Sequence, residues 1–299
     1  AAFALGLPLL FTLERGNLIL VAFACFVLAH GDVIRSRFGR AMVVAATINF
    51  KPYLLLPVLG WAVKREWRAL ELAGIATVAL YLATLAMVGA GSLQEIAANT
   101  LNWVAFQSGQ VWNEVNYSTS YAPFLSIREM QIPVLQFVSS RLVERIEFAV
   151  PLVIRATQVI ALAALCMAWV QRRAVSARRI AALLMGVYLV TQSPGGYAQV
   201  FLLFLVLLEP FRRPGPIVAI VCAYLLCLVG DMQMATILQI GSKSWLADRD
   251  VMPIFGLTWG HFIRPGLIVL IVWALSLDTI ARAARAHGFR APSLGLAAT

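Results

Sequence analysis

Four residues with polar or flexible character interrupt an apolar segment near the start of the chain, in the stretch FTLERGNLIL. Glu14 and Arg15 bring opposite charges, Gly16 brings backbone freedom and Asn17 brings an amide. Ionisable groups inside apolar segments indicate a functional site, because a charge is costly in hydrocarbon. The alternative is a charge pair at an interfacial turn, with no role in chemistry.

A second polar interruption is NFKPY, which places Lys51 and Tyr53 between two apolar runs. Lys51 could hold an anionic group, and Tyr53 offers a hydroxyl beside it. The alternative for Lys51 is an ammonium that snorkels to the interface along its own methylene stem.

Two further stretches combine groups suited to sugars. The segment NWVAFQSGQVWNEVNYSTSYAPFLS (102–126) mixes tryptophan and tyrosine with amides and hydroxyls, including Asn116 and Ser118. The stretch SPGGY adds Ser193 and the Tyr197 hydroxyl around a flexible turn. Aromatic rings beside amides suit sugar faces and hydroxyls, although an aromatic belt at a membrane interface has a similar composition.

The composition says which kind of fold must position these residues. Hydrophobic residues make up 61% of the 299 residues and charged residues only 13%, with a mean hydropathy of +0.83. Soluble domains are nearer half apolar and a quarter charged. We therefore predict an all-α polytopic membrane protein, with residues 1–299 forming a single transmembrane domain.

Basic clusters predict the orientation of the chain. The net charge is +10, and most basic residues lie in short groups between apolar runs, which indicates cytoplasmic loops and contact with anionic membrane lipids rather than nucleic acid. Residues 90–148 and 231–265 are then extracytoplasmic loops. The five clusters are Arg35, Arg37, Arg40; Lys64, Arg65, Arg68; Arg172, Arg173, Arg178, Arg179; Arg212, Arg213; and Arg282, Arg285, Arg290.

Some apolar runs are long enough to span and others are too short. The full spans are expected at 70–89, 149–170, 216–230 and 266–281. The short runs pair as hairpins around polar tips, because thirteen helical residues cover only about 20 Å of a roughly 30 Å hydrocarbon core. A single span with Lys51 at its centre is the alternative for the second hairpin. The paired arms are 1–13 with 18–30, 41–50 with 53–63, and 180–192 with 198–209.

Several site types have no signature in the sequence. There is no GxxxxGK[ST] phosphate loop, no HExxH and no GxSxG elbow. We see no dense acidic cluster for a metal, so we predict a metal-independent reaction without a cofactor. The four cysteines lie in apolar runs and are interpreted as packing residues.

The order of these elements resembles glycosyltransferase family 87, in the GT-C superfamily of polyprenol-phosphate-dependent membrane glycosyltransferases. RGN precedes an apolar helix, a Lys-Pro centre and a basic KREWR follow, then an outer loop with Asn116-x-Ser118, then a helix ending in SP with a tyrosine nearby. The resemblance covers roughly residues 5–230. The runs NYSTSY and SPGGYAQ depart from the usual family pattern.

The resemblance implies a GT-C-like bundle with short broken helices and an inverting transfer of a hexose, with mannose as the family-level guess. The donor would be a polyprenyl-phosphate sugar and the acceptor an extracytoplasmic glycolipid or glycan, at a bacterial cytoplasmic membrane. The catalytic carboxylate base is expected upstream of this chain, which begins AAFALGLPLL without Met and which we expect to be N-terminally truncated. The catalytic residue is therefore unknown.

The resemblance also implies roles for the polar residues. Arg15 and Asn17 would bind the lipid phosphate or sugar, and Glu14 would orient Arg15. Lys51, Arg15 and Arg155 are the cations that could stabilise a leaving phosphate. The expected substrate-binding residues are Glu14, Arg15, Asn17, Lys51, Tyr53, Asn116, Ser118, Ser193 and Tyr197. A transporter or lipid flippase, or a polysaccharide polymerase or ligase, is the alternative function.

Overall fold

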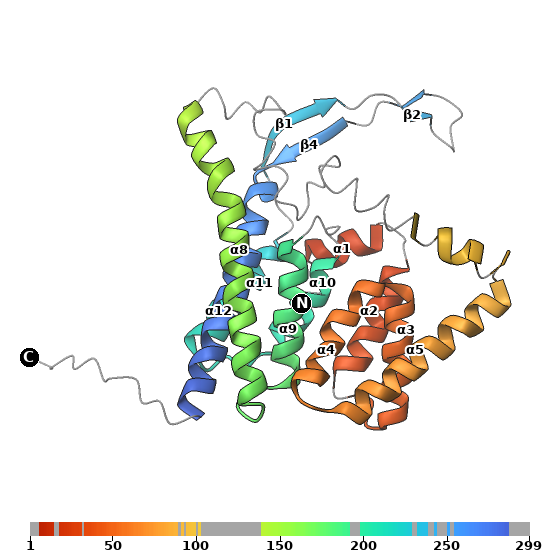
Figure 1. The fold of residues 1–299 in the computed structure, drawn as a ribbon. Helices are drawn as coiled ribbons and strands as arrows, with labels where there is room; N and C mark the ends of the chain where they lie inside the picture. Colours follow the sequence, from red (N-terminus) through yellow and green to blue (C-terminus); the bar gives the residue numbers. More distant parts are fainter. Residues whose placement is uncertain are drawn as a thin grey trace, which may run out of the picture.

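The chain is predominantly helical in a computed structural model (Figure 1). Its helices gather into one bundle whose ends are clearly different from each other. The residues that the structure describes are 6–14, 18–31, 33–88, 91–92, 94–99, 101–102, 139–191, 198–228, 232–238, 242–243, 250–251 and 254–286.

Three helices are long and apolar enough to cross a membrane, among the residues described. They are α5 (Trp67–Val88), α8 (Ser140–Val170) and α12 (Gly260–Ala286). The helix α8 begins well before the predicted span at 149, because Ser139 has extended backbone and the following residues favour helix. Its 31 residues measure about 46 Å, more than the hydrocarbon core requires.

The short helices confirm the predicted paired arms. They are α1 (Leu7–Glu14) with α2 (Ile19–His30), α3 (Arg37–Phe50) with α4 (Leu55–Val63), and α9 (Ala177–Thr191) with α10 (Gln199–Leu207). The helix α11 (Pro214–Leu226) then leads outward from the arginine-rich end, and its 13 residues are fewer than the full span predicted at 216–230 requires.

The break between α3 and α4 settles the choice left open for residues 41–63. Lys51 has extended backbone, with φ −145° and ψ 98°, and Pro52 starts a short 3-10 helix, η1 (Pro52–Leu54). Proline cannot donate the hydrogen bond that would continue α3. Arg37 at the start of α3 and Arg65 after α4 line the same cavity, so the chain returns to the end it left. The segment is a hairpin and not a single span.

The core of the bundle is built around α10. Seven of its nine residues are buried, and Phe201 meets Phe26 edge-to-face at 5.0 Å and Phe23 at 5.8 Å between ring centroids. Neighbouring helices approach closely where glycines lie. A Cβ on Gly186 of α9 would come within 2.5 Å of a methyl of Val272 in α12. Small residues of this kind let membrane helices pack through their backbones.

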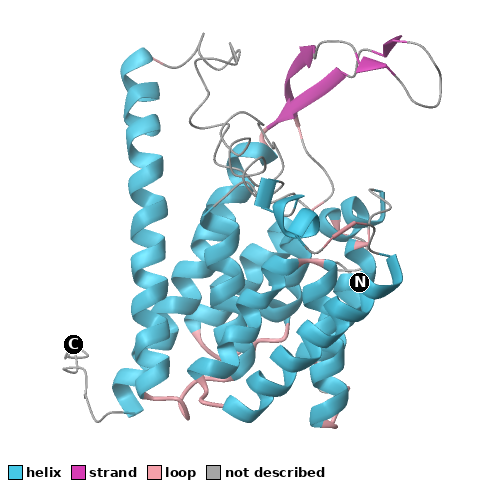
Figure 2. Cartoon of the chain, turned by 45° about the vertical axis from the view of Figure 1, so that its right-hand side comes forward, coloured by secondary structure: helices cyan, strands magenta, loops and turns pink. Residues whose placement is uncertain are grey.

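The described part of the second expected outer loop contains strands. Strand β1 (Gln233–Leu238) pairs antiparallel with β4 (Ile254–Thr258), and β2 (Ser242–Lys243) pairs with β3 (Asp250–Val251). Figure 2 shows them beyond one end of the helices, near the start of α8 in Figure 1. The all-α expectation therefore holds for the bundle, while these strands were not foreseen because short apolar runs between helices carry a weak pattern.

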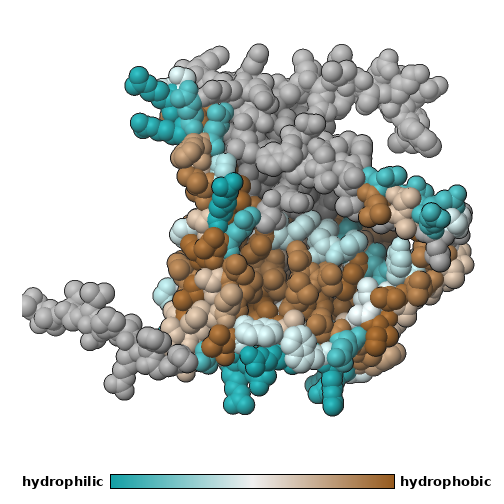
Figure 3. Space-filling model, in the orientation of Figure 1, coloured by the Kyte–Doolittle hydropathy of each residue, from teal (hydrophilic) through white to brown (hydrophobic). Residues whose placement is uncertain are grey.

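The described members of all five basic clusters lie at the opposite end of the bundle. Figure 3 shows hydrophilic side chains gathered at this end, with an apolar band above them. This agreement with the charge pattern was predicted from the sequence, and we call this region the arginine-rich end. Contacts between residues of different helices and turns bring the clusters to this one end: Arg37 and Arg65 line one cavity, Lys64 contacts Arg172, and Arg179 pairs with Glu209 and Asp278.

Candidate functional site

Lys51 and Tyr53 lie at the break between α3 and α4, as the sequence predicts. The Lys51 amide donates a hydrogen bond to the Thr47 carbonyl at 3.1 Å, which ends α3, and its side chain is half-buried. Tyr53 stacks on Tyr188 of α9, with ring centroids 4.6 Å apart and planes only 9° from parallel. Lys51, with its ammonium group, therefore lies where the helix is interrupted, two residues before the tyrosine that stacks on Tyr188.

The aromatic stack joins two of the predicted hairpins. Tyr188 lies in the last turn of α9, just before the SPGGY stretch, and Tyr53 also meets Phe201 near the start of α10 at 6.3 Å. Since α10 also contacts α1 and α2, the arms of all three hairpins pack together. The ends of α3 and α9, which carry Lys51 and Tyr188, lie away from the arginine-rich end, because both helices start there (Figure 1).

Asn49, next to this break, has a structural role. Its amide nitrogen donates to the Ala45 carbonyl at 2.9 Å and to the Thr77 carbonyl at 3.2 Å. The second bond crosses from α3 to α5. Asn49 therefore holds the end of α3, next to the break, against the long helix α5. Its amide serves helix packing, whereas Lys51 brings a positive charge to the break.

Two more of the predicted residues, Glu14 and Arg155, lie in the part of the chain that the structure describes. Glu14 is the last residue of α1, which agrees with an interruption at this position. Arg155 lies on an exposed face of α8. Six predicted residues lie outside the described residues, and their roles stay predictions: Arg15, Asn17, Asn116, Ser118, Ser193 and Tyr197.

A buried charge network at the arginine-rich end was missed by sequence reasoning. Arg179, only 1% exposed, donates from Nε to Glu209 Oε1 at 2.7 Å and from Nη1 to Asp278 Oδ2 at 2.9 Å. Glu209 and Asp278 are themselves 5% and 7% exposed. Arg282 adds a second cation on Asp278, at 2.7 Å. The two arginines balance the two carboxylates, so this network is electrically neutral.

The network ties together α9, the end of α10 and α12. A bidentate contact to Glu209 is the geometry in which guanidinium binds carboxylate most strongly. The one available signal was Asp278, an acid near the end of a long apolar span. Asp278 is buried and is paired with two arginines, Arg179 and Arg282, which indicates a structural role and not a binding site.

Lys64 forms a second connection at this end. Its ammonium donates to the Val175 carbonyl at 2.8 Å and to the Arg172 carbonyl, so the α4–α5 turn is held against the α8–α9 turn. Burial lowers the pKa of this ammonium; Glu66 opposes that shift and Arg172 adds to it. Two carbonyl acceptors explain why the lysine points inward rather than into water.

No group of three or more His, Cys, Asp or Glu that could hold a metal occurs among the described residues. The four cysteines are free thiols, with Cys222 and Cys227 buried in the packed core. Among the groups described here, the Lys51 ammonium can bind an anion, and the Tyr53 ring can pack against another ring.

No protein-family model, curated protein or solved structure matches the chain. The family resemblance noted in the sequence therefore stays a prediction.

Proposed function

We propose that this chain is a membrane glycosyltransferase with a GT-C-like arrangement, which moves a hexose, such as mannose, from a polyprenyl-phosphate donor to an extracytoplasmic glycolipid or glycan. The observation that carries the proposal is the break at Lys51. It puts a cation at an interrupted helix, beside the Tyr53–Tyr188 stack, where the arms of three hairpins pack together. Irregular backbone at membrane depth is tolerated where protein or a water-filled cavity satisfies it.

A cation at this position suits the chemistry of the donor. When the anomeric carbon is attacked, the phosphodiester becomes a phosphomonoester and gains negative charge. A fixed ammonium in a water-poor site stabilises that charge more than the same group would in water. Lys51 would therefore bind the donor phosphate and stabilise it as the leaving group, while Tyr53 supports the sugar or the prenyl chain.

The charge distribution supports an orientation for this site. The arginine-rich end would face the cytoplasm by the positive-inside rule. The break at Lys51 lies at the end of α3 opposite Arg37, so the reaction would occur on the extracytoplasmic side of a bacterial cytoplasmic membrane. The acceptor hydroxyl would be deprotonated by a carboxylate base, and the product would have inverted anomeric configuration.

The test is transfer of radiolabelled hexose from polyprenyl phosphate in membranes, comparing wild type with Lys51→Ala and Lys51→Arg. We expect the alanine variant to lose about 10²- to 10³-fold in rate, because one charge-stabilising group is removed, and the arginine variant to lose less. Arg172→Ala is the matched control, since it removes one cation from the arginine-rich end. If wild type and Lys51→Ala transfer hexose at the same rate, Lys51 is not part of the site.

A transporter or lipid flippase is the second candidate, because interrupted helices with a polar residue at the break also form transport sites. The discriminating measurement uses the purified chain in proteoliposomes. Movement of a lipid-linked sugar between leaflets without transfer to an acceptor supports the flippase. Cleavage of the bond between the sugar and the lipid phosphate supports the transferase. Product of repeating length would identify a polysaccharide polymerase.

A further inference from the structure

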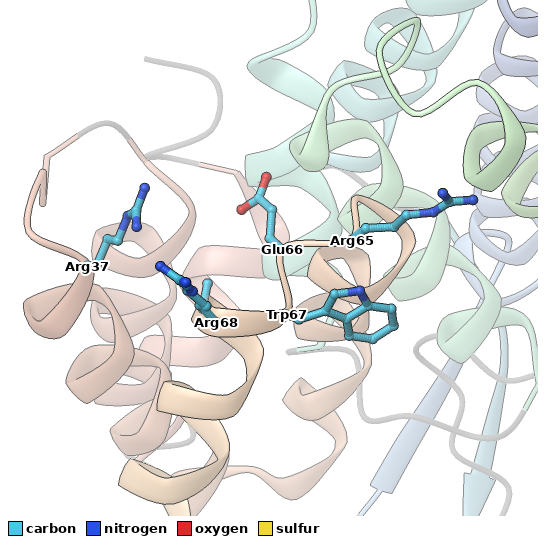
Figure 4. Close-up of a pocket in the computed structure, with 6 residues that line it drawn as sticks. Arg37, Arg65, Glu66, Trp67 and Arg68 are labelled. Atoms are coloured by element: carbon cyan, nitrogen blue, oxygen red, sulfur yellow. The ribbon is translucent and has the colours of Figure 1, made fainter.

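A cavity of about 470 Å³ opens at the arginine-rich end, between the first turn of α3 and the turn that joins α4 to α5 (Figure 4). It is far from the helix breaks at the other end of the bundle, and the proposed function does not use it. The lining residues are Arg37, Arg65, Glu66, Trp67, Arg68 and Ala69.

The cavity wall is positively charged. Three arginines and one glutamate line it, which leaves a net charge of +2. In Figure 4, Arg37 and Arg68 lie beside each other, whereas Arg65 extends away from them. The Arg65 guanidinium lies 5.0 Å from the ring centroid of Trp169 on α8, so it already has a cation–π partner.

Arg37 and Arg68 have no hydrogen-bond or ion-pair partner within the described part of the chain. Both side chains are exposed, and they come from different helices, α3 and α5. Glu66 on the same wall offsets only one of the three arginine charges, so the cavity attracts an anion. A phosphate group fits this need, because each guanidinium can donate two parallel hydrogen bonds to its oxygens.

The surface next to the cavity indicates where the rest of the ligand would lie. On α5, Arg68 is followed on the same face by exposed Glu71 and then by Ile75, Val78 and Leu82 at helical spacing. These three apolar side chains are 68%, 57% and 54% exposed. The apolar stripe covers about 10 Å of helix, and its far end lies about 21 Å from Arg68, which is more than the depth of one membrane leaflet. Trp67, at the cavity mouth, is 48% exposed and suits the interfacial layer.

We propose that this cavity binds the phosphate headgroup of an anionic phospholipid, with Arg37 and Arg68 gripping the phosphate and the acyl chains lying along Ile75, Val78 and Leu82. The site joins charge and apolar surface in the order in which a lipid presents them. Free inorganic phosphate would use the two arginines but none of the stripe, so the lipid binds much more tightly.

The experiment measures lipid binding to the purified full chain in neutral detergent by native mass spectrometry. The probes are dioleoyl phosphatidylglycerol, dioleoyl phosphatidylcholine and inorganic phosphate. The variants are Arg37→Gln, Arg68→Gln and their combination. The control Arg172→Gln/Arg173→Gln removes the same charge from the same end, outside the cavity.

We expect the double variant to bind phosphatidylglycerol at least about tenfold more weakly than wild type, and the control pair to change affinity less than about threefold. Phosphatidylcholine should bind weakly to all proteins, and millimolar inorganic phosphate should not displace phosphatidylglycerol. Equal weakening in the control pair overturns the proposal, because it indicates general charge attraction. Displacement by inorganic phosphate overturns it in favour of a free-anion site. The single variants preserve the test if the double variant does not fold.

Discussion

Arg179 and Arg68 lie at the same end of the bundle, yet their guanidinium groups have opposite surroundings. Arg179 is buried and holds Glu209 and Asp278 across three helices. Arg68 is exposed beside a cavity and has no such partner among the described residues. The comparison teaches that a basic cluster, which in the sequence only indicates orientation, contains residues of two kinds. One kind fixes the helices, and the other remains available to the membrane.

The largest expected effect comes from breaking the buried pair. Arg179→Ala leaves buried Glu209 without its cation and Asp278 with Arg282 alone, and we expect it to lower the free energy of unfolding by about 3–5 kcal/mol. Equilibrium unfolding in mixed micelles measures this loss. Arg173→Ala is the control, because Arg173 is exposed in the neighbouring turn, and its free energy of unfolding should stay within about 0.5 kcal/mol of wild type. A small effect of Arg179→Ala would show that water reaches the carboxylates.

An intermediate effect should follow when the three most buried members of the network are exchanged and Arg282, which is 19% exposed, is kept. The triple variant Arg179→Met, Glu209→Leu, Asp278→Leu removes the desolvated charges together and fills their volume. We expect it to be more stable than Arg179→Ala by at least about 2 kcal/mol, because buried ion pairs can be replaced by apolar residues without large cost. The same unfolding measurement applies. If the triple variant is as unstable as the single variant, the network determines which helices pair and does not merely stabilise them.

The smallest effect is expected at the open cavity. In neutral detergent without added lipid, Arg68→Ala should change the free energy of unfolding by no more than about 0.5 kcal/mol, because its side chain is exposed and has no partner to lose. Thermal unfolding with and without phosphatidylglycerol measures this. Wild type should gain stability from the lipid, and the variant should gain less. A large loss without lipid would mean that Arg68 is structural, as Arg179 is.

The hairpin arms could be predicted from the sequence because their signals are local. Short apolar runs, a basic residue at each turn and the Lys51–Pro52 pair together imply an interrupted helix, and α3, η1 and α4 follow that expectation. The Arg179 network could not be predicted, since its partners lie 30 and 99 residues away and meet only through packing. The strands β1 and β4 were missed for a different reason, because short apolar runs between helices carry a weak strand pattern.

The candidate site was predictable only in part. Lys51 and Tyr53 fall at a break, as expected, but the Tyr53–Tyr188 stack depends on how two hairpins pack. Asn49 was expected in the polar cluster, and its bond to Thr77 assigns it to helix packing instead. An amide in a polar run has the same appearance in a sequence whether it binds a substrate or a neighbouring helix.

The Lys64 connection has a consequence for how the protein is made. Its acceptor carbonyls belong to Arg172 and Val175, which are synthesised 108 and 111 residues later. At about 5–20 residues per second, the ribosome needs on the order of 5–20 seconds to supply them. Until Val175 has been made, the turn between α4 and α5 lacks both of these acceptors. This turn can therefore be held in its final position only after more than half of the chain has been synthesised.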